Sequence, residues 1–472
     1  MNELKPWQWA AFSLGLVVAL FLLYNHLQYF GSVSFLGGIL LIELIIASLW
    51  KYDQRFFTLL MIAFVWAGMN LPMQGAWTGG RWVVLTAGAL IGYLIWMKTP
   101  RSGFKSIHLI GAFCVGAAFV SATVSPFPGM ASSKALSLFI LFLYCASGAR
   151  LAVLGREERF FSGLTLASEI VVYVTALCYL GIGEQIWGNP NSLGAAMSIG
   201  IFPILLWRWL TTSERVKRLR RLFALLLCVY LIVFSMARAG MAAMVLVTIV
   251  FCLSLHQYRL LLKVAGLALL LIAVTGMLSP DKLSKSMHEL SDAVLYKGHK
   301  DEGILGSRLS PWEKSITTIK EHPWFGTGYG TSPTGQDPGL AFGRFASSAE
   351  TSREHGSSYM TIAEWVGLLG VVPFVLLLGL TFANVWRVFR WMIRTSDPCH
   401  YSIPLAMVIF AGFVHAGFED WLFAVGSYPC VYFWSFAFLL ADLVPPALAV
   451  PDSRVFFRIP SPAGFGAVVP NR

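Results

Sequence analysis

Charge is the scarcest property of this chain. Only 12% of its 472 residues are Asp, Glu, Lys or Arg, and 57% are hydrophobic, whereas an average soluble domain is roughly 25% charged. Apolar runs of about 20 residues recur, which is the length that crosses a bilayer as an α-helix. The runs are continuous rather than alternating, and this favours helices over a closed barrel. The sequence therefore predicts an all-α polytopic membrane protein.

Cysteine is also sparse, and its placement excludes two kinds of site. Six of the seven cysteines lie in apolar runs and the long polar segment described below has none, so neither a disulfide framework nor a zinc-ligand spacing is present. The first apolar run, from Trp7, lacks a small-residue cleavage site and is expected to be an anchor. The net charge of +11 comes from short connectors, as the positive-inside bias predicts, so we expect no nucleic acid partner.

The apolar runs predict about fourteen transmembrane helices, which together make up most of the chain. Their expected ranges are Trp7–Leu27, Val33–Leu49, Phe56–Met73, Trp82–Met97, Ile107–Val124, Ala135–Leu154, Phe161–Ile182, Leu193–Leu210, Leu222–Met236, Ala239–Leu255, Leu260–Leu278, Tyr359–Phe389, Ile403–Phe418 and Leu422–Val444.

Cationic residues alternate between connectors and predict the orientation. One set of alternate connectors carries nineteen Lys and Arg residues, and the intervening short connectors carry only Arg81, Lys134 and Arg238. The positive-inside rule then places both termini in the cytoplasm. Arg238, the connector at 188–191 and the one long polar segment fall on the opposite, extracytoplasmic face.

The long polar segment divides the chain. We expect transmembrane helices over residues 1–278, an extracytoplasmic loop over 279–358, further transmembrane helices over 359–444 and a cytoplasmic tail over 445–472. Loops held by a rigid scaffold carry function more often than the scaffold does. A structureless loop of this length is otherwise uncommon, so the chemistry is expected here.

Arg238 interrupts an apolar stretch of more than thirty residues, Leu222–Leu255. A guanidinium near the membrane boundary is costly unless it meets an anion or a water-filled cavity, although an arginine that snorkels to a lipid headgroup would fit too. The small neighbours Ala237, Ala239 and Gly240 would let a bulky ligand approach, which favours an anion site.

Arg308 lies beside a predicted helix within the loop. Ser310-Pro311-Trp312-Glu313 has the pattern of a capping box with proline at the first helical position. Trp312, Ile316 and Ile319 then share one face, so Ser310–Glu321 is expected to be a short amphipathic helix. Arg308 just upstream would add charge to a helix N-terminus that already favours anions, although a solvated loop arginine fits the same position. The glycines of Gly326-Thr327-Gly328-Tyr329-Gly330 predict a tight structural turn more than a phosphate cradle.

His355 stands immediately before the next apolar run. Histidine suits a general base or a hydrogen-bonding positioner near neutral pH, and a satisfied structural histidine is the alternative. Glu364 follows one to two turns into the span, with Gly367 and Gly370 expected to permit close helix packing.

These motifs resemble the O-antigen ligase and O-antigen polymerase superfamily. The resemblance rests on S-M-A-R-A-G at 235–240, on G-S-R-L-S-P-W-E at 306–313 with P-W-F-G-T-G-Y-G at 323–330, and on E-H-G-S-S-Y at 354–359. It is specific over about Gly188–Gly370 and architectural elsewhere. Two positions depart from the family pattern: Gly356 stands where Asn is common after the histidine, and Ala237 where Ser is common before the first arginine.

The resemblance implies a polytopic glycosyltransferase of the family C type that works outside the cytoplasmic membrane. Its donor would be a polyprenyl-diphosphate-linked oligosaccharide and its acceptor a lipid-linked repeat or a lipid A core, with no nucleotide sugar, no metal and no other cofactor. Arg238, Arg308 and His355 would be catalytic. Arg238, Arg308, Asn189, Asn191 and Glu364 would bind substrate. Membrane lipids and a chain-length regulator or flippase are the expected partners.

Other functions fit parts of this pattern. Polymerase and ligase differ only in the acceptor, and the number of spans with the loop length favours the polymerase. A transporter of lipid-linked sugars is the alternative of a different class, with Glu43 and Glu169 lining a path, although both fit buried helix-packing groups. The chain shows no matching halves of the kind that transporters often have.

Overall fold

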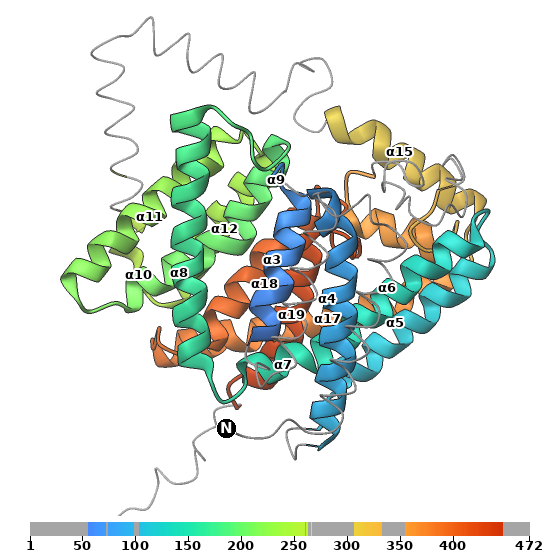
Figure 1. Ribbon diagram of the computed structural model, residues 1–472, viewed down its shortest axis with the longest axis horizontal. Coiled ribbons are helices and arrows are strands. Elements are labelled where there is room, and N and C mark those ends of the chain that lie inside the picture. Colours follow the sequence, from blue (N-terminus) through green and yellow to red (C-terminus); the bar gives the residue numbers. More distant parts are fainter. Residues whose placement is uncertain are drawn as a thin grey trace, which may run out of the picture.

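The computed structural model describes residues 55–71, 74–98, 103–259, 261–262, 266, 306–332 and 355–446, and these form helices and no strands. The expected spans Trp7–Leu27 and Val33–Leu49, almost all of Leu260–Leu278, Glu43 and the tail after Pro446 lie outside the described residues. Figure 1 shows the described helices as one bundle with α15 at one end.

The helices follow the apolar runs closely, because lipid forces each spanning segment to satisfy its own backbone. They are α3 (Phe56–Gly68), α4 (Gln74–Lys98), α5 (Ser106–Thr123), α6 (Pro128–Ala146), α7 (Gly148–Val153), α8 (Glu157–Ala176), η3 (Leu177–Ile182), α9 (Pro190–Ala195), η4 (Ala196–Ile201), α10 (Phe202–Thr211), α11 (Arg215–Phe234), α12 (Arg238–Ser254), α15 (Gly306–Glu321), α17 (Ser358–Thr395), α18 (Ser402–Ala416) and α19 (Tyr428–Leu443), where η marks a π-helical stretch.

Six helical segments among the described residues are long and apolar enough to cross a membrane. Four more, α3, α12, α18 and α19, are apolar but shorter. The all-helical membrane fold is therefore confirmed, whereas the count of about fourteen spans is not. Large apolar side chains such as Leu369, Val372 and Val375 on α17 are more than half exposed, as expected for a surface that faces lipid rather than water.

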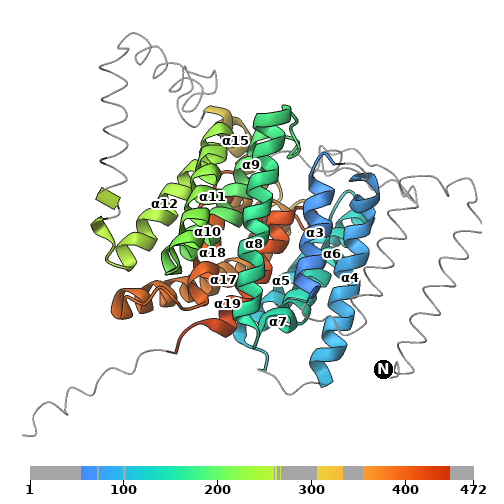
Figure 2. The ribbon, with the colours of Figure 1, turned by 60° about the vertical axis from the view of Figure 1, so that its left-hand side comes forward.

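α19 lies at the centre of the bundle (Figures 1 and 2) and contacts α3, α5, α6, α7, α17 and α18. Every residue from Pro429 to Leu440 is buried. A helix that is apolar on all sides is stable only in such a position. α19 is thus the axis on which the spanning helices pack.

Two ion pairs that contain a buried carboxylate join helices of the bundle. Arg150 of α7 is completely buried and donates from Nε and Nη2 to the carboxylate of Asp442 on α19, at 2.6 and 3.0 Å. Glu169 of α8 is 97% buried and pairs with Arg220 of α11 at 3.0 Å. Glu169 thus links two helices, and this favours the helix-packing interpretation of this residue over a transport path.

The loop helix α15 differs from its predicted start. It begins at Gly306 rather than after Ser310, so Pro311 lies inside it and Arg308 in its first turn. The capping-box prediction was wrong: Pro311 is the sixth residue of the helix, so the helix continues through a proline that removes one of its backbone hydrogen bonds. The face turned to the protein includes the buried Ser315 with Trp312 and Ile319 half-buried, while Ile316 is exposed.

The segment after α15 is bound into a break in α17. Gly367 has a φ of +67° and interrupts the helix, so four backbone groups of α17 lose their helical partners. The N–H groups of Thr327 and Gly328 donate to the carbonyls of Glu364 and Trp365, at 3.0 and 3.1 Å. The N–H groups of Leu368 and Leu369 donate to the carbonyls of Pro323 and Trp324, at 2.7 and 3.2 Å.

Glycine is required on both sides of this junction. A Cβ on Gly326, whose φ is +72°, would lie 2.4 Å from the Trp365 carbonyl oxygen, and a Cβ on Gly367 would lie 2.5 Å from the Gly326 nitrogen. The glycine-rich turn predicted from the sequence is therefore structural. The prediction that Gly367 permits close helix packing was incomplete. This glycine also breaks the helix and lets the backbone of residues 323–328 bind there.

Candidate active site

A carboxylate that the sequence analysis did not single out organises the site. Glu419 lies in the connector between α18 and α19, and its Oε1 accepts from Arg308 Nη2 at 2.5 Å and from Asn191 Nδ2 at 3.2 Å. The arginine comes from α15 and the asparagine from α9, so Glu419 links two elements that are far apart in the sequence. A charge-assisted contact of this length fixes the position of the guanidinium.

His355 lies between two further carboxylates. Its Nε2 is 3.2 Å from Glu364 Oε1, and its Nδ1 is 3.4 Å from Asp420 Oδ2. The backbone N–H of His355 also donates to Asp420 Oδ2, at 3.2 Å. The imidazole and Glu364 are completely buried, whereas the Asp420 side chain is 33% exposed. Two carboxylates at the two ring nitrogens stabilise the positive charge that the imidazole gains when it accepts a proton.

His355 favours the ionised form of Asp420. Burial opposes its ionisation, but hydrogen bonds from the ring and backbone of His355 outweigh this effect and hold the pKa of Asp420 below its ordinary value. Hydrogen bonds to the charged form of a carboxyl favour that form. Asp420 is therefore an ionised partner for His355 at neutral pH.

The connector that carries Glu419 and Asp420 is anchored to the start of α17. The Glu419 carbonyl accepts from the N–H of Ser358 at 2.9 Å and from its hydroxyl at 2.6 Å, and the same hydroxyl accepts from the Leu422 N–H at 3.1 Å. The two acidic side chains thus share one rigid backbone with the histidine segment.

Gly356 has a physical reason to follow His355. Its φ is +69°, and a Cβ would lie 3.0 Å from Cδ of Arg308. Its carbonyl accepts from Trp312 Nε1 at 3.3 Å. Glycine adopts the left-handed region at no steric cost, and asparagine is the commonest other residue there, so Gly356 preserves the backbone that the resembling family's Asn would adopt.

Arg238 is the first residue of α12 and is partly buried. The charges of Arg238 and Arg308 are close enough to repel each other. Both stand in the first turn of a helix, where a cation opposes the helix dipole. Two neighbouring guanidinium groups, of which Arg308 is also paired with Glu419, form a candidate site for an anion that carries more than one negative charge.

The small residues around Arg238 have a different role from the one predicted. A Cβ on Gly194 of α9 would lie 2.3 Å from Ala237 Cβ, and a Cβ on Gly240 would lie 3.1 Å from the Gly194 carbonyl oxygen. Their small size therefore lets α9 pack against the start of α12. The prediction that they leave room for a ligand was wrong, because helix packing fills that space.

Asn189 and Asn191 lie at the start of α9. The Asn189 side chain caps this helix by accepting from the Ser192 N–H at 2.7 Å, which is the usual work of an N-cap asparagine. Asn191 instead reaches Glu419. A substrate-binding role for either stays a prediction, as it does for the buried Glu364.

The structure thus brings Asn191, Arg238, Arg308, His355 and Glu364 to one end of the bundle. Sequence reasoning missed Glu419 and Asp420. The available signal was an adjacent pair of acids in Gly417-Phe418-Glu419-Asp420-Trp421, a connector between two long apolar runs on the face where cations are scarce. Within the described part of the chain, no group of three or more His, Cys, Asp or Glu side chains is arranged to hold a metal ion.

The fold and the site define a polytopic helical membrane protein with an arginine- and histidine-containing site at one end of its bundle. Residues 223–375 match the family model described as O-Antigen ligase, which confirms the resemblance to the O-antigen ligase and polymerase superfamily. The match contains Arg238, Arg308, His355 and Glu364, and it ends before Glu419 and Asp420. It implies a glycosyltransferase-like membrane enzyme. No curated protein sequence matches this chain.

Proposed function

We propose that this chain transfers a glycan from a polyprenyl diphosphate to an acceptor sugar hydroxyl, at the extracytoplasmic face of a bacterial inner membrane. The observation that carries the proposal is the pairing of two mutually repelling arginines, Arg238 and Arg308, with a histidine set between carboxylates. The family match over residues 223–375 supports the same reaction class.

The arginines suit the leaving group. When the bond between the anomeric carbon and the diphosphate oxygen breaks, the diphosphate leaves with the electron pair and gains negative charge. Guanidinium groups bind phosphate oxygens through paired hydrogen bonds. Groups positioned in advance where charge develops are worth more for catalysis than groups that must reorganise, and Glu419 holds Arg308 in such a position.

The histidine suits the acceptor. The acceptor hydroxyl oxygen forms the new bond to the anomeric carbon, and its proton passes to the His355–Glu364 pair. Asp420 at Nδ1 orients the ring and stabilises the charge that the imidazole gains. A single displacement of this kind inverts the anomeric centre. The reaction needs no metal in this proposal, so activity should persist in the presence of a chelator.

The test uses purified full-length protein in liposomes with a polyprenyl-diphosphate-linked glycan and an acceptor. We expect His355→Ala and Arg308→Ala to lower turnover about 10²-fold or more, since positioned acid–base and electrostatic groups each contribute roughly that much. His322→Ala and Lys320→Ala are matched controls, because both residues are exposed near the end of α15, and they should keep normal turnover.

Two outcomes would contradict the proposal. Near-normal turnover in His355→Ala or Arg308→Ala would remove the assigned site. Movement of lipid-linked glycan across the liposome membrane without a new glycosidic bond would make the chain a transporter. The acceptor follows from mass spectrometry of lipopolysaccharide in a deletion strain: single-repeat products indicate a polymerase, and free lipid-linked polymer with bare core indicates a ligase.

A further inference from the structure

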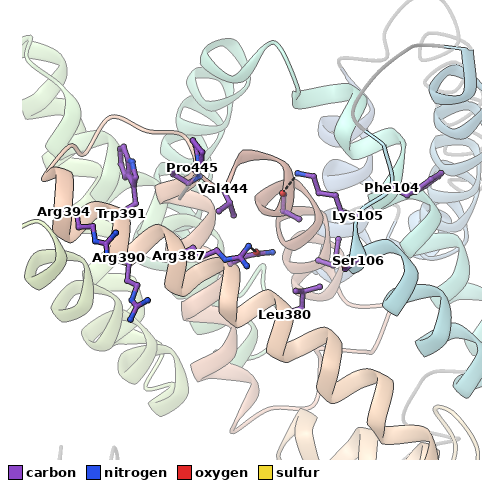
Figure 3. Close-up of a pocket in the computed structure, with 14 residues that line it drawn as sticks. Phe104, Lys105, Ser106, Leu380, Arg387, Arg390, Trp391, Arg394, Val444 and Pro445 are labelled. Atoms are coloured by element: carbon purple, nitrogen blue, oxygen red, sulfur yellow. Dashed lines mark hydrogen bonds between the residues drawn. The ribbon is translucent and has the colours of Figure 1, made fainter. Parts of the chain in front are cut away.

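A basic cavity lies at the end of α17 that is remote from His355. Its volume is about 920 Å³, and it is lined by the start of α5, the last turns of α17 and the end of α19. Figure 3 shows Arg387 extending from α17 and Lys105 from the start of α5 into the space between these elements. Nothing in the proposed reaction uses this cavity.

The charge of the cavity is of one sign. Lys105, Arg387, Arg390 and Arg394 line it, and none of the described Asp or Glu residues does. The nearby Asp442 is already bound by Arg150 and by Lys105, the latter at 3.2 Å. The lining arginines of α17 are spaced three and four residues apart, so they share one side of the helix. Because Lys105 is paired with Asp442, the three arginines of α17 are the cations of the lining that an entering anion would stabilise.

Within the described residues, these three arginines have no carboxylate partner. Arg387 Nη1 donates a long hydrogen bond of 3.5 Å to Asn384 Oδ1, and the guanidinium carbon of Arg390 lies 5.5 Å from the centroid of the Trp386 ring. Elsewhere at this end of the bundle, arginines pair with acids, as Arg150 and Arg208 do. The α17 arginines differ from these two in having no such ion pair within the described part of the chain.

The lining also changes polarity along α17. Leu380 lines the cavity on the side nearer the middle of the helix, and Arg394 lines it near the last turn. Phe382 and Trp386, on the exposed surface of the same stretch, are about half exposed. Aromatic side chains concentrate where a membrane meets water. The cavity therefore spans the boundary between acyl chains and headgroups.

We propose that this cavity binds an anionic phospholipid, with its phosphate held by Arg387, Arg390 and Arg394. Guanidinium groups form paired hydrogen bonds with phosphate oxygens. The apolar side of the lining suits the first part of the acyl chains. A membrane-bounded position and this polarity favour a lipid over a free phosphate, which would gain nothing from Leu380.

The experiment measures lipid binding to the purified full-length protein by native mass spectrometry. Dioleoylphosphatidylglycerol and dioleoylphosphatidylcholine are added in parallel, and glycerol 1-phosphate is added as the headgroup without acyl chains. We expect phosphatidylglycerol to bind in preference to phosphatidylcholine and to resist displacement by glycerol 1-phosphate. The variant R387Q/R390Q/R394Q should lose roughly 100-fold in affinity for phosphatidylglycerol, since each basic residue near a membrane surface contributes about fivefold.

The matched control is R215Q/K217Q/R218Q, which removes the same charge from exposed residues at the start of α11. This control should bind phosphatidylglycerol normally. Equal losses in the two triple variants would reduce the effect to general surface charge and overturn the proposal. Equal competition by glycerol 1-phosphate would show a free phosphate site and overturn the lipid assignment. If the triple variant lacks a cooperative thermal transition, the single variant R390Q is used instead. Its affinity for phosphatidylglycerol should fall about fivefold, and an unchanged affinity would contradict the proposal.

Discussion

At the residue scale, the site is a set of opposite charges held at fixed distances. Glu419 positions Arg308, and Asp420 positions His355, although the two acids are adjacent in one short connector. A single backbone segment therefore sets the spacing between the anion-binding part and the proton-accepting part. Orientation of this kind accounts for large rate effects in enzymes even where no new chemical group is added.

Asp420→Asn tests that arrangement. The amide keeps the size of the side chain but loses the charge that stabilises a protonated His355, so we expect turnover to fall about 10- to 100-fold with little change in KM. The comparison is made in the liposome assay proposed above, with initial rates over a range of acceptor concentrations. A rise in KM with unchanged kcat would instead mean that Asp420 binds the acceptor.

The stability of the same variant should depend on pH in a defined direction. The pKa of Asp420 is lowered in the folded protein, so its contribution to stability is present above the ordinary carboxyl pKa of about 3.9 and is lost as the pH falls through the lower folded value. The difference in Tm between the parent and Asp420→Asn should therefore be constant from about pH 8 to pH 5 and shrink below about pH 4. A difference that disappears already near pH 6 would contradict this.

At the scale of single elements, α17 and the segment after α15 depend on each other. The broken helix and the glycine-rich segment supply partners for each other's backbone groups, and buried backbone groups without partners are costly. Glu364 sits beside this junction, so the same break also sets the position of the carboxylate at His355 Nε2.

Gly326→Ala and Gly367→Ala should each destabilise the protein. Both glycines have a positive φ, and an added Cβ would meet backbone atoms at 2.4 and 2.5 Å, so the loss should be roughly 1–3 kcal/mol or more. Thermal unfolding in detergent measures the change. Gly379→Ala is the control on the same helix, because an added Cβ there meets nothing within 4 Å, and it should be neutral or slightly stabilising. Similar losses at all three positions would contradict the account of the junction.

The helix positions themselves follow from the sequence, since long apolar runs in lipid have few alternatives. Runs such as Ile107–Val124 and Ile403–Phe418 coincide with α5 and α18 to within about two residues, the scatter expected of any boundary assignment. The break at Gly367 does not follow, because a glycine in an apolar helix usually means close packing. The break depends on contacts with a segment some forty residues earlier in the chain. The sequence around Gly367 does not indicate those contacts.

At the scale of the whole molecule, the buried pair of Arg150 and Asp442 ties the central helix α19 to α7. Arg150 also lies over the ring of Trp96 on α4, with its guanidinium carbon 4.0 Å from the ring centroid. The charge count treated Arg150 as one more connector cation. In the structure Arg150 is instead paired with an acid almost 300 residues away in the sequence. That pairing is a property of the tertiary structure.

Arg150→Ala should therefore be destabilising, by up to about 3–5 kcal/mol, because it removes the buried partner of the Asp442 carboxylate and leaves only the half-exposed Lys105 to compensate it. Lys217→Ala is the comparison, since its pair with Glu214 is more than half exposed and exposed pairs contribute roughly 0–1 kcal/mol. Chemical denaturation in detergent, followed by tryptophan fluorescence, measures both. Equal effects would mean that burial of the Arg150 pair adds nothing.

The candidate site was predictable in part, and the division has a physical origin. Arg238, Arg308 and His355 stand out because charge within or beside an apolar run is rare. Glu419 and Asp420 are ordinary connector residues until the ends of α9, α15 and α17 converge on them. The polarity of a residue can be read from the sequence around it, whereas its partner depends on how the helices pack.

The junction at Gly367 also has a consequence for biogenesis. The four backbone groups of α17 near this glycine require partners from residues 323–328, and these residues leave the ribosome before α17 does. Their donors and acceptors are therefore already synthesised when the membrane receives α17. Insertion of this span therefore depends on the polar segment that precedes it, and a chain from which residues 323–328 are deleted would present a broken span to lipid.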